Sequence, residues 1–157
     1  MIKKIAVIRI RGSFGVKKEI KDTMNMLRLY NKNHCVIVNS SPNNVGMIKK
    51  IKDYVTWGEV DEKTFKELMT KRGRVAANKI ITEQYLKENA KTSMEEFIKE
   101  FFNFKKNLKD IPGLKAYFRL KPPIKGFERK GIKVPYSMGG VLGYRKEKIN
   151  DLILRML

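Results

Sequence analysis

The side chains that could carry out covalent or metal chemistry are few in this chain. It has one histidine, His34, and one cysteine, Cys35, adjacent at the start of a β-branched run. One histidine cannot build the multi-histidine spacing of a zinc site, and a histidine-activated nucleophile would depend on this residue alone. One cysteine rules out an internal disulfide framework, which fits a reducing cytoplasm. His34 therefore has two possible roles: it acts with a nearby acid in an RNA-processing enzyme, or it is a structural side chain.

Adjacent carboxylates, the other residue type used in acid–base chemistry, occur at Asp61-Glu62 and Glu95-Glu96. Both pairs stand at the start of a predicted helix, where negative charge offsets the positive end of the helix dipole. We therefore assign both pairs to helix capping. The sequence predicts no enzymatic activity, no metal and no cofactor.

Phosphate binding has better support. Gly12-Ser13-Phe14-Gly15 lies between a predicted strand and a predicted helix, where free backbone N–H groups attract phosphate. The loop lacks the Lys and Ser/Thr of a nucleotide-hydrolysing loop, because Val16 follows the last glycine. It is either a tight turn or a dock for an RNA backbone phosphate, and basic residues flank it. The candidate RNA contacts here are Arg9, Arg11, Ser13, Phe14, Lys17 and Lys18.

The strongest candidate for an RNA-binding segment is the stretch FRLKPPIKGFERKGIKVPYSMGG at residues 118–140. Its apolar residues follow neither a helical nor a strand period. Its basic residues alternate with aromatic ones, which combines phosphate neutralisation with surfaces on which bases stack. A mobile surface loop is the alternative reading. Arg72 and Arg74 form a smaller basic group of the same kind. The candidates in the stretch and just beyond it are Arg119, Lys121, Lys125, Phe127, Arg129, Lys130, Lys133, Tyr136 and Arg145.

The distribution of charge supports a polyanionic partner. The 157 residues carry 35 Lys and Arg against 16 Asp and Glu, a formal charge of +19. Residues 1–60 and 115–148 each have net charge +8, whereas residues 61–114 have +3. Such an excess destabilises a compact state by self-repulsion unless a polyanion is bound. Adaptation to high temperature would raise Glu together with Lys, so nucleic acid is the first partner to expect, contacted by both ends of the chain.

The elements that must position these residues follow from the hydrophobic period. A β-branched strand signature comes first, and amphipathic helices alternate with two further strand signatures. The first 60 residues therefore read β-α-β-α-β, a two-layer α+β unit with one small sheet covered by helices on one face. The expected strands lie at residues 5–10, 35–38 and 54–60, and the expected helices at 16–30 and 43–55.

Residues 61–157 are assigned to an extension with a helical part (61–114), a basic extended segment (115–144) and a C-terminal helix (145–157). Asp61, Thr82 and Ser93 each precede a predicted helix, and Ser93 with Glu96 has the spacing of a capping box. Residues 117–120 are the best strand candidate in the basic segment. The apolar face of the last helix is typical of core packing, with a membrane-surface anchor at residues 152–157 as a weaker alternative.

Four segments together closely resemble one protein family. They are AVIRIRGSFGV, SSPNNVGMIKKIKDYVTWGEV, YFRLKPPIKGF and GIKVPYSMGGVLGYRKEKIND. The family is that of the universal large-subunit ribosomal protein number thirty, in its long archaeal form, whose eukaryotic counterpart is called protein seven. The resemblance runs from residue 2 to residue 157. It implies a ferredoxin-like core with an antiparallel three-stranded sheet, an extension that bacterial members lack, and no catalysis.

The resemblance also implies a structural role in the large ribosomal subunit in the cytoplasm. The implied partners are large-subunit rRNA, the 5S rRNA nearby and neighbouring ribosomal proteins, with no membrane and no small-molecule substrate. A ribosome-assembly factor that leaves the mature subunit is the alternative. By position, the rRNA-facing elements are the Arg11–Gly15 turn, the Pro42–Met47 loop with Asn43 and Asn44, and the basic extension. Val45 stands where many members have a basic residue, so we expect Lys49 and Lys50 to contact phosphate instead.

Overall fold

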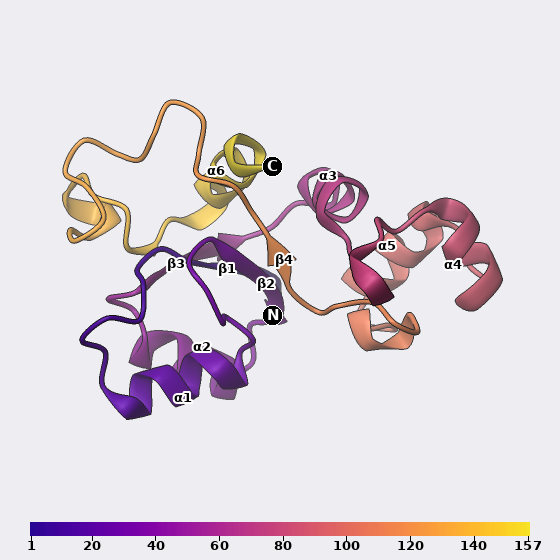
Figure 1. Cartoon of the computed structure of the whole chain (residues 1–157), viewed down its shortest axis with the longest axis horizontal. Helices are drawn as coiled ribbons and strands as arrows, with labels where there is room; N and C mark the ends of the chain where they lie inside the picture. Colours follow the sequence, from indigo (N-terminus) through magenta and orange to yellow (C-terminus); the bar gives the residue numbers. More distant parts are fainter.

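A five-stranded sheet organises the chain, which a computed structural model describes over residues 1–157 (Figure 1). The sheet order is β4-β2-β1-β3-β5, and all six residues of the central strand are buried. Burial on both faces explains why this strand reads as a nearly continuous apolar run rather than as an alternating pattern. The strands are β1 (Lys4–Arg9), β2 (His34–Asn39), β3 (Val55–Glu59), β4 (Phe118–Arg119) and β5 (Gly143–Tyr144).

The α+β class is confirmed, but the sheet has more strands than the three antiparallel ones expected. Strands β2, β1 and β3 are antiparallel as expected. The extension adds β4 antiparallel to β2 and β5 parallel to β3, so the sheet is mixed and has five strands. Each added strand is only two residues long, too short to produce a strand period in the sequence.

Helices α1 (Lys18–Met26) and α2 (Pro42–Lys50) cover one face of the sheet. Ile5 and Val7 of β1 point to this face and share a cluster of ten buried apolar residues with Met24, Ile48 and others from the two helices. Ser41 begins α2 at its N-cap, where its Oγ accepts a hydrogen bond from the N–H of Asn44, and Pro42 occupies the first turn.

The extension covers the opposite face, so the molecule has three layers. Ala6 and Ile8 of β1 point to this side and belong to a cluster of 26 buried apolar residues drawn from both sides of residue 60. Fully burying one such aliphatic or aromatic side chain contributes about 1.5–3 kcal/mol to the free energy of unfolding. The helices of the extension are α3 (Glu62–Arg72), α4 (Glu83–Asn89), α5 (Met94–Phe102) and α6 (Ile149–Met156).

Local capping explains where the extension's helices begin. Thr82 accepts from the N–H of Tyr85 (3.2 Å), and Ser93 and Glu96 form the predicted capping box at 3.3 and 3.4 Å. Asp61 occupies the N-cap position of α3, but its side chain makes no capping bond. No helix combines the length and apolar character that a membrane crossing requires.

Helix α6 is a core element. Leu152, Ile153 and Met156 have no exposed surface, so the apolar face considered for a membrane anchor is packed inside the protein. The helix also holds the basic segment, because the N–H groups of Lys121 and Ile124 donate to the carbonyls of Met156 and Arg155, both at 2.9 Å. The basic segment is therefore hydrogen-bonded to its own chain.

Candidate nucleic-acid interface

The loop between β1 and α1 projects away from the sheet. Ser13, Phe14, Lys17 and Lys18 are exposed, and the Phe14 side chain is as accessible as in an extended peptide, at 104%. Arg11 is half-buried, with its guanidinium 5.1 Å from the Tyr54 ring centroid. An aromatic ring at a loop tip between lysines is suited to stacking on an unpaired base while the lysines contact phosphate.

Arg9 does not fit the predicted role. It is 2% exposed, and its guanidinium donates to the carbonyls of Leu29 (2.8 Å), Tyr30 (2.9 Å) and Arg11 (3.0 Å). Burial lowers the pKa of Arg9. Arg9 follows Ile5 and Val7 at the strand period of two, so its side chain points to the same face of the sheet as theirs. On that side, the carbonyls of the turn after α1 need hydrogen-bond donors. Arg9 therefore orders this turn and is left out of the interface.

Helix α2 presents a second set of predicted contacts. Asn43 at its start and Lys49 and Lys50 in its last turn are exposed. Lys50 approaches Glu19 at 3.9 Å across two exposed side chains, a pair that contributes little. Asn44 is half-buried, and its Nδ2 donates to the Asn39 carbonyl (2.9 Å). The amide of Asn44 therefore braces the turn between β2 and α2.

The basic segment presents most of its cations to solvent. The six predicted Lys and Arg contacts within residues 119–133 are all exposed, and none forms an ion pair with a carboxylate of the protein. They are Arg119, Lys121, Lys125, Arg129, Lys130 and Lys133. Because the backbone of this segment is held by α6, these charges lie on a constrained surface.

Arg145 is the second predicted contact that lies inside the protein. It is 3% exposed, and its guanidinium donates to Thr56 Oγ1 (2.8 Å), Glu128 Oε1 (2.8 Å) and the Val141 carbonyl (2.7 Å). Its fourth contact is the Tyr136 ring, 4.7 Å from the guanidinium carbon. Arg145 thus links the basic segment to β3. Tyr136 and Phe127 are both half-buried, and Phe127 packs against the larger apolar cluster.

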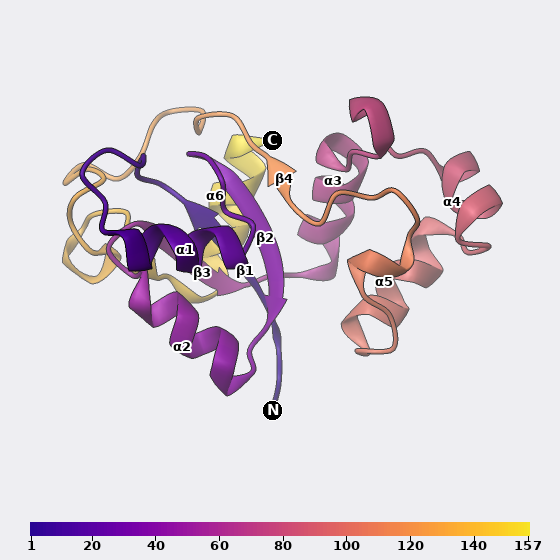
Figure 2. The same cartoon turned by 60° about the horizontal axis from the view of Figure 1, so that its bottom comes forward.

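The fold brings the loop between β1 and α1 and the distal part of the basic segment to the same end of the molecule, in both views (Figures 1 and 2). Helices α3, α4 and α5, whose region has the low net charge, form the other end. Arg72 and Arg74 are half-buried at the end of α3 and so are not brought together with the other predicted contacts. The two regions of high positive charge therefore share one end of the protein.

Comparison with known proteins supports the family assignment. Residues 5–55 match the family model described as Ribosomal protein L30p/L7e. The chain is 49% identical over 152 residues to the large ribosomal subunit protein uL30 of Nanoarchaeum equitans, covering 97% of each chain. It is 48% identical to that of Methanopyrus kandleri, covering 94% of this chain and all of the relative, and 49% identical to that of Methanococcus maripaludis.

The chain belongs to the uL30 family. The resemblance seen in the four sequence segments is thereby confirmed. The family model covers the strands β1 and β2 and the helices α1 and α2, whereas the archaeal uL30 relatives also align with the extension. The extension is thus shared with archaeal uL30 proteins of nearly the same length.

The histidine and the cysteine considered for chemistry are both buried in this uL30 family member. His34 is 5% exposed, its Nδ1 accepts from the N–H of Asn31 (3.4 Å), and its ring stacks on Tyr117. Its pKa is lowered by burial, with smaller contributions from the charges of Arg119 and Arg9. Cys35 has no exposed surface, and burial raises the pKa of its thiol. Both fit a structural role, because neither is hydrogen-bonded to a carboxylate.

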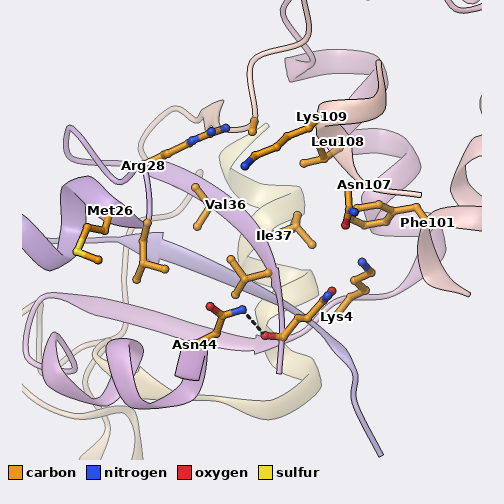
Figure 3. A pocket seen from close by; sticks show the side chains of 14 residues that line it. Lys4, Met26, Arg28, Val36, Ile37, Asn44, Phe101, Asn107, Leu108 and Lys109 are labelled. Atoms are coloured by element: carbon orange, nitrogen blue, oxygen red, sulfur yellow. Dashed lines mark hydrogen bonds between the residues drawn. The ribbon is translucent and has the colours of Figure 1, made fainter. Parts of the chain in front are cut away.

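One feature was not foreseen from the sequence, a groove of about 420 Å³ between the family core and the extension (Figure 3). Three cations line it, Lys4, Arg28 and Lys109, which are far apart in the sequence. Residues at such separations share no local period, so only a prediction of long-range contacts would have found the groove.

Proposed function

We propose that this protein is a structural constituent of the large ribosomal subunit that binds large-subunit rRNA. The observation that carries the proposal is the identity of 48–49% with archaeal large ribosomal subunit proteins uL30 over nearly the full length of both chains. The formal charge of +19 supports rRNA as the partner, because rRNA supplies the negative charge that relieves self-repulsion.

The proposed rRNA-binding surface combines three elements: the loop between β1 and α1, helix α2 with Lys49 and Lys50 in its last turn, and the basic segment. Their exposed lysines and arginines would neutralise phosphates, and Phe14 would stack on an unpaired base. Shape rather than base edges would supply most of the discrimination, as in other proteins that bind structured RNA. Arg9 and Arg145 would act indirectly, by holding the backbone of these elements in place.

The same proposal assigns the protein no catalytic role and locates it in the cytoplasm within the assembled subunit. Proximity to the 5S rRNA and contacts with neighbouring ribosomal proteins follow from the family resemblance and are proposed with it. The end formed by α3, α4 and α5 has ordinary surface charge, which suits contact with a neighbouring protein better than contact with rRNA.

The proposal is tested by the salt dependence of binding to naked large-subunit rRNA, compared with an equal mass of double-stranded DNA. We expect a steep slope of log affinity against log salt, together with a clear preference for rRNA. Equal affinity for both polymers would contradict specific docking and would show that the charge acts without selectivity.

A ribosome-assembly factor that leaves the mature subunit is the second candidate. Sedimentation of cell extract separates the two, because a structural constituent is found in assembled large subunits at one copy per subunit. Recovery only from precursor particles would favour the assembly factor.

A further inference from the structure

The groove between the core and the extension carries an inference that rests on the proposed rRNA binding and goes beyond it. One wall comes from the core, through the end of α1, the outer part of β2 and Asn44 of α2. The other comes from the extension, through Phe101 of α5 and the 3-10 turn η2 (Leu108–Asp110) with the residue before it. Neither half forms the groove without the other.

The charge of the groove is one-sided. Lys4, Arg28 and Lys109 are its charged lining residues, and no Asp or Glu lines it. None of the three forms an ion pair elsewhere in the protein. Arg28 and Lys109 extend toward each other along one rim (Figure 3). Two unpaired like charges at one rim repel, and an anion between them removes that cost.

Lys4 adds a third positive charge at the side of the groove. It is 4% exposed, and its Nζ lies 3.8 Å from the centroid of the Phe101 ring and 4.8 Å from that of Phe104. The rings hold the ammonium in place by cation–π attraction, but they supply no counter-ion. Burial lowers the pKa of Lys4 to about 8, so at neutral pH Lys4 is protonated without a counter-ion, and an anion bound nearby would stabilise its charge.

The floor and the other rim suit a base rather than a bare phosphate. Val36 and Leu108 are among the apolar side chains of the lining, and Asn44 lies on the side away from Arg28 (Figure 3). Asn39 also lines the groove. Strand β4 pairs with β2 only at His34 and Cys35, so the outer edge of β2 beyond Cys35 has no strand partner where it lines the groove. Free backbone groups at such an edge can hydrogen-bond a ligand.

We propose that this groove binds one unpaired nucleotide of the rRNA, with its phosphate between Arg28 and Lys109 and its base against Val36 and Leu108. The volume of about 420 Å³ lies in the range of about 300–1,000 Å³ typical of small-ligand sites and is too small for a double helix. A bound nucleotide would join the family core to the extension. The unpaired edge of β2 would also accept a peptide strand, but an all-cationic lining favours RNA over an ordinary peptide.

The test measures how fast lysines are acetylated in the full-length protein, by mass spectrometry, with and without ligand. The exposed Lys109 reports on the groove, and the exposed Lys79 and Lys87 of the extension are the controls. A single-stranded RNA hexamer at about ten times its dissociation constant should slow acetylation of Lys109 about tenfold and leave the controls unchanged. A short RNA duplex and hexaglutamate should give no such protection.

Protection by the duplex or by hexaglutamate equal to that by the hexamer would overturn the proposal, the second result identifying a peptide site instead. With intact rRNA, protection of Lys121 and Lys130 but not of Lys109 would overturn the groove proposal and leave rRNA binding standing. Protection of no lysine would overturn both.

A matched pair of variants completes the experiment. Arg28→Gln with Lys109→Gln removes two charges from the rim, and Lys79→Gln with Lys87→Gln removes two from the control surface. We expect only the first pair to lower the slope of rRNA affinity with salt, by about 0.7–0.9 for the one phosphate at this rim. Equal slopes for the two pairs would contradict a phosphate at this rim.

Discussion

At the scale of single residues, Lys4 is the clearest case of a charged side chain whose burial lowers the free energy of unfolding of the isolated protein. Its ammonium is buried above aromatic rings, and burial lowers its pKa from 10.5 to about 8. Below pH 8, Lys4 is protonated in both the folded and the unfolded chain, so the folded state bears the full cost of desolvation. As the pH rises from 8 toward 10.5, the folded chain loses the proton first and the cost falls.

Lys4→Met should therefore stabilise the protein. We expect the free energy of unfolding to rise by about 1 kcal/mol at pH 7, less than the pKa shift alone would give because solvent screens part of the charge. The gain should disappear by about pH 10.5. Urea unfolding at both pH values measures it, with the exposed Lys3→Met as control. A Lys4→Met variant less stable than the parent at pH 7 would show that the cation–π contacts outweigh desolvation.

At the scale of elements, the contact between β3 and the turn before α6 depends on a glycine. Gly58 is buried, and a Cβ placed on it would overlap the backbone carbonyl of Lys146 and lie 3.0 Å from Ile149 Cβ. The backbone of η4 (Lys146–Lys148) cannot move away without separating α6 from the sheet. The conformation of Gly58 is ordinary, so its role is close approach and not a special backbone angle.

Gly58→Ala should lower the free energy of unfolding by about 3 kcal/mol, the upper part of the range for overpacked sites. Gly46→Ala is the matched control, because a Cβ there would meet nothing within 4 Å and the residue lies inside α2. The control should be more stable than the parent by about 0.5–1 kcal/mol. Thermal or urea unfolding of both variants makes the comparison, and equal stability of the two would contradict the packing argument.

The ion pair between Glu128 and Arg145 is the second feature at this scale. Glu128 is the one acidic residue of the stretch at 118–140, and it accepts a hydrogen bond from the buried Arg145 at 2.8 Å. The backbone between them folds back on itself, with the N–H of Val141 bonded to the Val134 carbonyl (2.9 Å). Removing the carboxylate leaves an unpaired charge inside the protein.

Glu128→Gln should loosen this part of the basic segment. We expect a destabilisation of about 2 kcal/mol, reduced from the value for a fully buried pair because Glu128 is 23% exposed. Hydrogen exchange should accelerate at the amides of Val141 and Leu142, both of which donate to Val134. The exposed Glu147→Gln is the control. Unchanged exchange in Glu128→Gln would mean that backbone bonds alone hold the segment.

At the scale of the whole molecule, the separation of charge predicts which end meets rRNA. Both regions of net charge +8 contribute to the end that carries the β1–α1 loop and the basic segment, and the helical end has the net charge of +3. Counter-ion release therefore concentrates at one end.

Replacing Arg119, Lys121, Arg129 and Lys130 with Ala should lower the salt slope of rRNA binding by up to ~4, about 0.9 for each phosphate that the variant no longer neutralises. The fold should remain intact, because all four side chains are exposed. A control variant with the same change in net charge replaces Lys63, Lys79, Lys87 and Lys105, which are exposed on the helical end. Equal slopes for the two variants would remove the basic segment from the interface.

Patterns in the sequence were enough to predict the local elements of the core and to recognise the family. The core strands and helices and the caps at Thr82 and Ser93 follow from patterns within a few residues, because hydrogen bonds and side-chain periodicity act over that range. The family motifs and the two basic regions were also visible there. The division of the chain at residue 60 and the RNA-contact residues as a set remain predictions.

Which charged side chains are exposed and which are bound inside the protein depends on the folded structure. Arg9 and Arg145 looked like their exposed neighbours in the sequence, but carbonyls and a carboxylate from distant segments bind their guanidinium groups. The same holds for the two short edge strands and for the groove that Lys4, Arg28 and Lys109 share. These features depend on contacts between residues far apart in the chain, and the spacing of residue types along a sequence carries no record of them.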